Sequence, residues 1–316
     1  MPFIKPRTSR VALATILLSS ACSKTHPMFV KILYLDNWTP LSLYFINLLF
    51  IVIFLSIYEF IRGDFHKRYS IKRGDVLGIF LTTLTGGIIS PLCFLFGLQM
   101  VLASEAILLT SISPLFIVIF SVLLLKEHFT KRMIFGGAFL LSSTVVLIWN
   151  DIFNASMSVG VPIILVGAIA GSLTTIFHKK FVSGNHLDFL VFIRSLTNLV
   201  IVSAILWFVE PEAFAMIKEP PSIWMILGLS VISFIVPYIL YYRAIRNVQS
   251  LDAGIVLTAG PVIGLLMANA FLKEQIQPDQ LVSVLLVGIG ITLINVPLTK
   301  RRIMPWRLMT IGPLRR

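Results

Sequence analysis

VLASEAILLTSISPLFIVIFSVLLLKE at residues 101–127 and VQSLDAGIVLTAGPVIGLLMANAFLKE at residues 248–274 decide the fold of this chain. Each stretch is a long apolar run that has a Pro near its middle and ends in Leu-Lys-Glu. A shift of 147 residues places Pro114 on Pro261 and the first Lys-Glu pair on the second. Apolar runs of about 20 residues cross a bilayer as helices. The two stretches therefore predict that the chain contains the same transmembrane helix twice.

The composition of the whole chain points the same way. Of its 316 residues, 57% are hydrophobic and only 13% are charged, and the mean hydropathy is +0.93. A soluble protein is about a quarter charged, and one of this length could not bury so much apolar surface. The composition thus excludes most soluble enzymes and binding modules. It predicts an integral membrane protein.

Ten apolar runs are long enough to span a bilayer. They lack the alternation of barrel strands, which favours helices. The first run follows several basic residues and resembles a signal peptide, but its apolar character resumes after Lys24 and His26, so we expect it to be retained. The predicted spans are 11–34, 39–61, 75–98, 103–125, 132–150, 157–178, 188–209, 222–242, 252–272 and 279–298. Four tryptophans fall at run ends, where interfacial anchors are expected: Trp38, Trp149, Trp207 and Trp224.

The basic residues predict the orientation of these spans. Of the 26 Lys and Arg residues, 21 fall in segments that the ten spans place on one side, and only Lys218 and Lys273 fall on the other. Basic residues accumulate in cytoplasmic segments, so both termini are predicted in the cytoplasm of a multi-pass protein of the cell inner (plasma) membrane. The net charge of +12 is thereby explained by topology, and we expect no nucleic-acid partner.

Each half of the chain contains five predicted spans, so the second copy of the repeated stretch is inverted relative to the first. Inverted repeats are typical of secondary transporters, whose binding site lies between the repeats near the bilayer midplane. The paired patterns Ala106-x7-Pro114-x12-Glu127 and Ala253-x7-Pro261-x12-Glu274 resemble the EamA-type members of the drug/metabolite transporter superfamily.

This resemblance implies an all-α integral membrane protein with ten transmembrane helices as two inverted five-helix repeats. The first EamA-like repeat would span residues 1–150 and the second 151–299, with a basic cytoplasmic tail at 300–316. It also implies that the second helix of each repeat often carries an Arg. Here the second repeat has Arg194 and the first has Asn47.

The pattern predicts a secondary transporter (a permease or exporter) that moves small metabolites, such as amino acids or related polar compounds, across the cytoplasmic membrane by alternating access. No Asp or Glu lies in the middle of a predicted span, which favours uniport or exchange over proton coupling. A membrane-embedded enzyme acting on lipid or isoprenoid substrates is the alternative, but the loops hold no paired-Asp or His-rich constellation. We expect no enzyme activity and no cofactor. The expected partners are a small-molecule substrate and the lipid bilayer, and a homodimer is left open.

Candidate substrate-binding residues are polar groups inside the spans and near their breaks. An ionisable side chain inside a bilayer should face the bundle interior. Helix breaks in corresponding spans point to a transport site, and here they fall at Gly86-Gly87 and Ser90-Pro91 in the third span and at Val236-Pro237 in the eighth. No catalytic residue and no metal ligand is predicted. The predicted substrate-binding residues are Ser23, Lys24, Asn47, Thr174, Arg194 and Tyr238.

Overall fold

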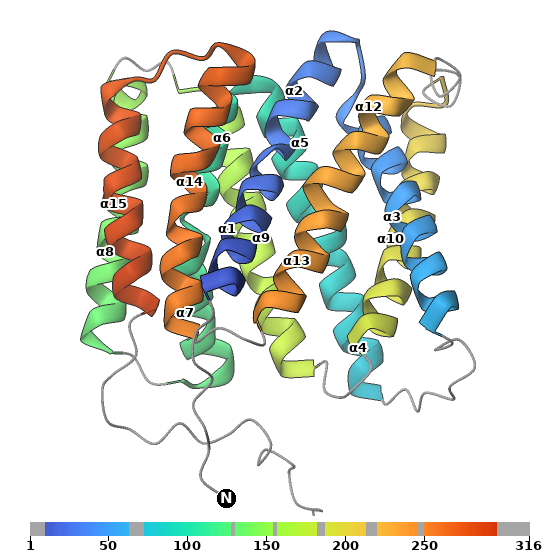
Figure 1. The fold of residues 1–316 in the computed structure, drawn as a ribbon, viewed down its shortest axis with the longest axis horizontal. Coiled ribbons are helices and arrows are strands. Elements are labelled where there is room, and N and C mark those ends of the chain that lie inside the picture. Colours follow the sequence, from blue (N-terminus) through green and yellow to red (C-terminus); the bar gives the residue numbers. More distant parts are fainter. Residues whose placement is uncertain are drawn as a thin grey trace, which may run out of the picture.

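A computed structural model describes residues 10–62, 73–127, 130–153, 157–181, 187–212, 220–245 and 250–295. These residues form helices that run side by side in one bundle, with no strand among them (Figure 1). In the first half of the chain the elements are α1 (Arg10–Lys24), α2 (His26–Leu35), α3 (Pro40–Arg62), α4 (Arg73–Thr82), the π-helical segment η2 (Thr83–Ile89), α5 (Ser90–Met100), α6 (Ala103–Thr110), α7 (Ser113–Leu125) and α8 (Lys131–Phe153). In the second half they are α9 (Gly160–Phe181), α10 (Leu187–Val209), α12 (Pro220–Ser230), the π-helical segment η3 (Val231–Ile235), α13 (Val236–Ile245), α14 (Ser250–Leu272) and α15 (Pro278–Asn295).

Seven helical stretches of the described chain are long and apolar enough to cross a membrane. They are Pro40–Tyr58, Gly74–Met100, Ala103–Leu125, Lys131–Trp149, Gly160–Phe181, Val191–Val209 and Pro278–Asn295. Trp224–Ile235 and Thr258–Leu272 are shorter apolar helices. Large apolar side chains such as Phe135, Phe208 and Leu285 are exposed on the outside of the bundle. Lipid, rather than water, is the solvent that such a surface requires.

Two of the predicted helix breaks coincide with π-helical turns. η2 directly precedes Ser90-Pro91, and η3 directly precedes Val236-Pro237. A proline has no N–H to donate to the carbonyl four residues before it, so the helix before each proline cannot keep its regular bonding. π-Helical turns occur often at functional sites. The two breaks are therefore candidates for lining a site.

The repeated stretches end in the same backbone conformation. Lys126, after α7, has φ 57°, and Lys273, after α14, has φ 56°. Apart from these two, Asn37 is the only non-glycine residue with positive φ in the described ranges. The stretches differ in the middle: Pro114 lies just after a break between α6 and α7, whereas Pro261 lies inside the continuous helix α14. The left-handed lysine is thus a shared helix stop, and the proline break is not shared.

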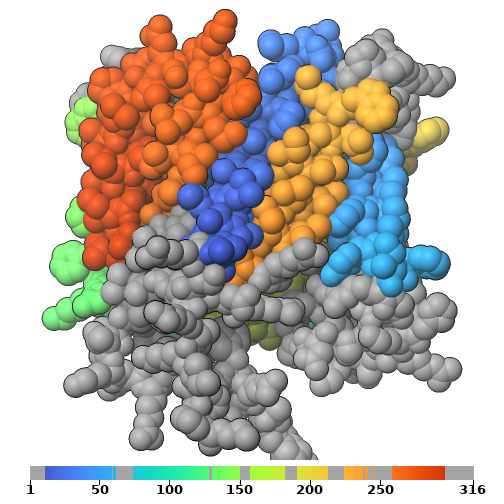
Figure 2. All heavy atoms as spheres, in the orientation of Figure 1, coloured from blue at the N-terminus to red at the C-terminus, as the bar shows by residue number. Residues whose placement is uncertain are grey.

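Packing interlocks the two halves of the chain. α1 packs against α13 and α14, and α9 packs against α5 and α7. Figure 2 shows α1 seated between α14 and the α12–α13 segment. α8 pairs with α15 at one end of the bundle, and α3 pairs with α10 at the other (Figure 1). Gly136 and Gly290 let α8 and α15 approach closely, because a Cβ on either glycine would lie 2.8 Å from the other's carbonyl oxygen.

The two ends of the described chain lie on the same side of the bundle. α1 begins and α15 ends at the lower side in Figure 1, where α4 and α8 also begin and α9 ends. Residues 300–316, predicted as a basic tail, lie outside the described residues. One predicted interfacial anchor is wrong: Trp38 is only 4% exposed and belongs to the core, whereas Trp149, Trp207 and Trp224 are exposed.

Candidate functional site

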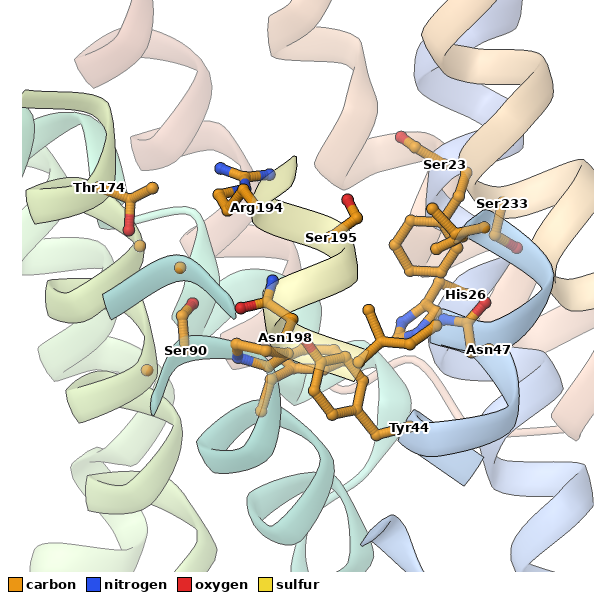
Figure 3. Close-up of a pocket in the computed structure, with 18 of the residues that line it drawn as sticks. Ser23, His26, Tyr44, Asn47, Ser90, Thr174, Arg194, Ser195, Asn198 and Ser233 are labelled. Atoms are coloured by element: carbon orange, nitrogen blue, oxygen red, sulfur yellow. The ribbon is translucent and has the colours of Figure 1, made fainter. Parts of the chain in front are cut away.

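A cavity of about 1190 Å³ lies inside the bundle. Its lining comes from both halves of the chain: from α1 and α2, α3, η2 and α5, α6 and α7, α9, α10, and η3. It reaches from His26 and Phe94 to His178 and Lys179 near the end of α9, which is the side on which the described chain begins and ends. Figure 3 shows the labelled polar side chains around this space. A site between the halves is where a transporter built from repeats binds its substrate.

One face of α10 supplies the main polar group of the cavity. Arg194, Ser195 and Asn198 project from the same helix and all line the cavity (Figure 3). Residues four apart share a helix face, which places Asn198 beside Arg194. The Asn198 side chain is 3% exposed, and its Oδ1 has no hydrogen-bond partner among the described residues. Because a buried polar atom without a partner is costly, the Asn198 amide is a candidate contact for a ligand.

The π-helical turn η2 is held by side chains from neighbouring helices. Pro91 leaves the Gly87 carbonyl without a helix N–H donor, and the Tyr44 hydroxyl of α3 donates a hydrogen bond to that oxygen. Thr85 and Thr174 share a hydrogen bond of 2.8 Å between η2 and α9. Gly86 also lies against Thr174: a Cβ on Gly86 would be 2.5 Å from the Thr174 Cγ2. The wall formed by η2 therefore has no room for a side chain at Gly86.

The other end of the cavity is aromatic. The His26 ring lies between the rings of Phe94 and Phe234, with centroid distances of 5.6 Å and 5.0 Å. Thr25 and Ser233 share a hydrogen bond of 2.7 Å, which joins the α1–α2 junction to η3. Three rings from α2, α5 and η3 thus form an apolar wall, at the point where the two halves of the chain meet.

The structure brings four of the six predicted residues together. Ser23, Asn47, Thr174 and Arg194 all line the cavity. Asn47 is held by Ser230, whose Oγ donates a hydrogen bond of 2.7 Å to the Asn47 Oδ1.

Of the other two predicted residues, Lys24 does not line the described cavity, and Tyr238 stays a prediction. The Lys24 side chain lies against α14, since a Cβ on Gly260 would be 3.3 Å from the Lys24 Cε. Tyr238 falls in α13, but its side chain lies outside the described residues. Sequence reasoning missed Asn198, although its spacing of four from Arg194 could have indicated it. It also missed the cavity-facing role of Phe94 and Phe234, which read as ordinary apolar residues.

The two repeated Lys-Glu pairs lie at opposite ends of the bundle and make different contacts. The Glu274 carboxylate accepts hydrogen bonds from the Ala103 N–H (2.8 Å), the Ser104 N–H (3.0 Å) and the Ser104 Oγ (2.6 Å), which caps α6. Glu127 instead forms an ion pair with Lys179 of α9, and both side chains are more than 40% exposed. Glu274 thus joins the segment after α14 to the start of α6, whereas Glu127 joins the segment after α7 to α9.

Comparisons with known proteins agree with this geometry. The model of the EamA-like transporter family matches residues 10–149 and again residues 158–296. A protein of Methanothermobacter thermautotrophicus named "Uncharacterized transporter" is 26% identical over 236 residues, covering 73% of this chain and 67% of that protein. The "Uncharacterized transporter YetK" of Bacillus subtilis is 24% identical over 240 residues, covering 72% and 70%. A solved crystal structure with a TM-score of 0.61 and 17% identity covers 90% of this chain and 96% of its own, a likeness that concerns the fold alone.

Proposed function

The chain belongs to the EamA-like transporter family, and we propose that it is a secondary transporter that moves small polar metabolites across the cytoplasmic membrane by alternating access. The cavity carries this proposal: it lies between two matched halves of the chain, and it combines polar side chains with a large volume in an apolar bundle. A small metabolite fits a pocket of this size. Arg194, Asn47, Thr174 and Ser23 are its proposed contacts.

The proposed architecture is ten spans in two inverted repeats, one over residues 1–150 and one over 151–299. The seven long spans become ten when α1 with α2, α12 with η3 and α13, and α14 are each counted as a further span. The packing supports the inversion: α1 contacts α13 and α14 as α9, its proposed counterpart, contacts α5 and α7. An odd number of spans in each repeat turns the second repeat upside down.

The proposed orientation places the ends of the described chain in the cytoplasm of the inner (plasma) membrane. Lys126, Lys131, Arg132 and Lys179 all lie at helix ends on the side where α1 begins and α15 ends. Basic residues favour the cytoplasmic side. The Glu127 end is then the inner end, and the Glu274 end is the outer end.

The proposed state is inward-facing. Glu274 holds α6 at the outer end through three hydrogen bonds. At the inner end the cavity reaches Lys179, whose side chain is 47% exposed. Transport then requires the outer cap to break and the inner end to close. Because no Asp or Glu of the described chain lines the cavity, the proposed mode is uniport or exchange, driven by the substrate gradient rather than by a carboxylate proton carrier.

Vesicle transport tests this proposal. The full chain is reconstituted in liposomes loaded with a mixture of amino acids and other small polar metabolites, and release of each compound is followed by mass spectrometry without an ion gradient. We expect selective release that Ser195→Trp blocks by filling the cavity. Val200→Trp is the matched control, because Val200 lies on the same helix but is 61% exposed to lipid. Equal release from both variants and from loaded liposomes without protein would contradict the proposal.

A further inference from the structure

We infer that the substrate is a small organic anion with an apolar or aromatic body and no cationic group. This inference rests on the proposed transport function and names the substrate class of the same cavity. The lining contains the basic residues Arg194 and Lys179, and no Asp or Glu among the described residues. A positive group in surroundings of low polarity attracts an anion strongly. A substrate ammonium would meet no carboxylate there.

The position of Arg194 gives the anion a specific place. Lys179 forms an ion pair with Glu127 at the inner end of the cavity. Arg194 lines the cavity wall from α10, four residues before Asn198. The guanidinium fork binds a carboxylate through two parallel hydrogen bonds.

The aromatic wall determines what the rest of the substrate must be. His26, Phe94 and Phe234 line the same cavity as Arg194, and the ring centroids of Phe94 and Phe234 lie 5.6 Å and 5.0 Å from that of His26. A fully polar anion would displace water from these aromatic side chains without making apolar contacts with them. An apolar or aromatic body gains burial and ring contacts there. The cavity is therefore amphipathic, with a cationic part on α10 and an aromatic part at the junction of the halves.

Five probes that differ by one group each test the substrate class. They are 3-phenylpropanoate, its neutral amide, 3-phenylpropylamine, phenylalanine and propanoate. Each is measured for thermal stabilisation of the detergent-purified full chain, and for uptake into proteoliposomes. We expect 3-phenylpropanoate to bind most tightly, because it alone has the anion and the ring without an ammonium group. Tighter binding of the amine, the amide or phenylalanine would overturn the inference.

Variants locate the two ends of the substrate. Arg194→Gln should weaken 3-phenylpropanoate binding about tenfold or more, because a charge-assisted hydrogen bond is lost, and Arg194→Lys should retain part of it. Lys180→Gln is the control: Lys180 is the exposed neighbour of Lys179 and does not line the cavity. Phe234→Ala should reduce the preference for 3-phenylpropanoate over propanoate, and Phe208→Ala, on the lipid face of α10 at 84% exposure, should not.

The outcomes separate the two proposals. Uptake of only neutral or cationic compounds keeps the transport function and overturns the anion site. Binding of 3-phenylpropanoate that Arg194→Gln leaves unchanged also overturns it. Absence of any carboxylate response overturns the substrate class, and absence of uptake for every compound in both vesicle experiments contradicts transport itself.

Discussion

Tyr44 satisfies a backbone carbonyl that a proline leaves without a donor. Its hydroxyl donates to the Gly87 oxygen in a buried position, and Pro91 cannot donate to that oxygen. Tyr44→Phe should therefore destabilise the fold by about 1–3 kcal/mol, the cost of leaving a buried acceptor unpaired. The measurement is the midpoint of thermal unfolding in detergent. Ser203→Ala is the control, because its hydroxyl bonds only within its own helix at the exposed side. Equal midpoints for the two variants would show that water or another donor replaces Tyr44.

Gly86 is a second residue whose size is fixed by its neighbours. A Cβ at Gly86 would lie 2.5 Å from Cγ2 and 2.6 Å from Oγ1 of Thr174. Thr174 cannot turn away easily, since it is β-branched and bonded to Thr85. Gly86→Ala should cost about 1–3 kcal/mol through overpacking and should also reduce transport, because the displaced Thr174 lines the cavity.

The matched control for Gly86 is Gly228 of α12, where a Cβ would meet no atom within 4 Å. Alanine there removes backbone freedom from the unfolded chain and should stabilise by up to about 1 kcal/mol. Thermal unfolding of both variants, with release of the preferred compound from vesicles, measures the contrast. A Gly86→Ala protein as stable and as active as Gly228→Ala would mean that η2 adjusts freely.

At the residue scale, candidate site residues were predicted from their charge and their depth in a span. The sequence could not predict which face of the helix each of these side chains occupies. Arg194 is on the cavity face of α10, as expected of an ionisable residue inside a span. Lys24 met the same criterion but lies against α14. A polar residue at mid-span can face any of several neighbouring helices inside the bundle, and the sequence does not say which one. For the same reason, the sequence did not show that Phe94 and Phe234 face the cavity.

At the scale of elements, the hydrogen bonds that link α14, α15 and α6 are the outer cap of the proposed inward-facing state. Glu274 accepts three hydrogen bonds from the first turn of α6, and Gln280 of α15 donates to the Ser104 Oγ at 3.1 Å. Replacing the carboxylate by a neutral amide weakens each of these charge-assisted bonds and the favourable interaction with the helix N-terminus. Glu274→Gln should therefore increase the population of the outward-open state.

Cysteine labelling from outside measures this shift. Ser113, which lines the cavity, is replaced by Cys in a background where Cys22 and Cys93 are Ala, and a membrane-impermeant maleimide is added to intact cells. We expect slow labelling with Glu274 present and faster labelling in Glu274→Gln. Glu127→Gln, the equivalent change at the other end of the bundle, is the control and should not speed labelling from outside. Identical rates in all three proteins would argue against the cap as a gate.

Helices were easier to predict than site residues, because the length of an apolar run indicates a helix and a proline indicates a helix break. The predicted spans agree closely with α3, α8, α9 and α10, and both breaks before Pro91 and Pro237 are present as π-helical turns. The different behaviour of Pro114 and Pro261 could not be predicted. Both lie at the same place in the repeated stretch, yet one follows a break and the other lies within a continuous helix.

At the scale of the whole molecule, the inverted repeat makes a prediction that no single helix could make. Lys126 and Lys273 occupy equivalent places in the two repeated stretches, are both exposed, and share the left-handed backbone conformation. The backbone strain that a substitution causes at a left-handed residue should therefore be the same at both positions. If the repeats are inverted, the two side chains lie on opposite sides of the membrane, although sequence and local structure are alike.

Single-cysteine variants of this pair measure the inversion. In the background without Cys22 and Cys93, Lys273→Cys should react with an impermeant maleimide added to intact cells, and Lys126→Cys should react only after the membrane is permeabilised. The positive-inside rule gives this direction, because Lys131 and Arg132 follow Lys126 closely. Labelling of both cysteines from outside would contradict the inversion, since repeats of equal orientation require an even number of spans between the two lysines. The reverse pattern would keep the inversion and place the Glu274 cap at the cytoplasmic end, so that the structure would represent the outward-facing state.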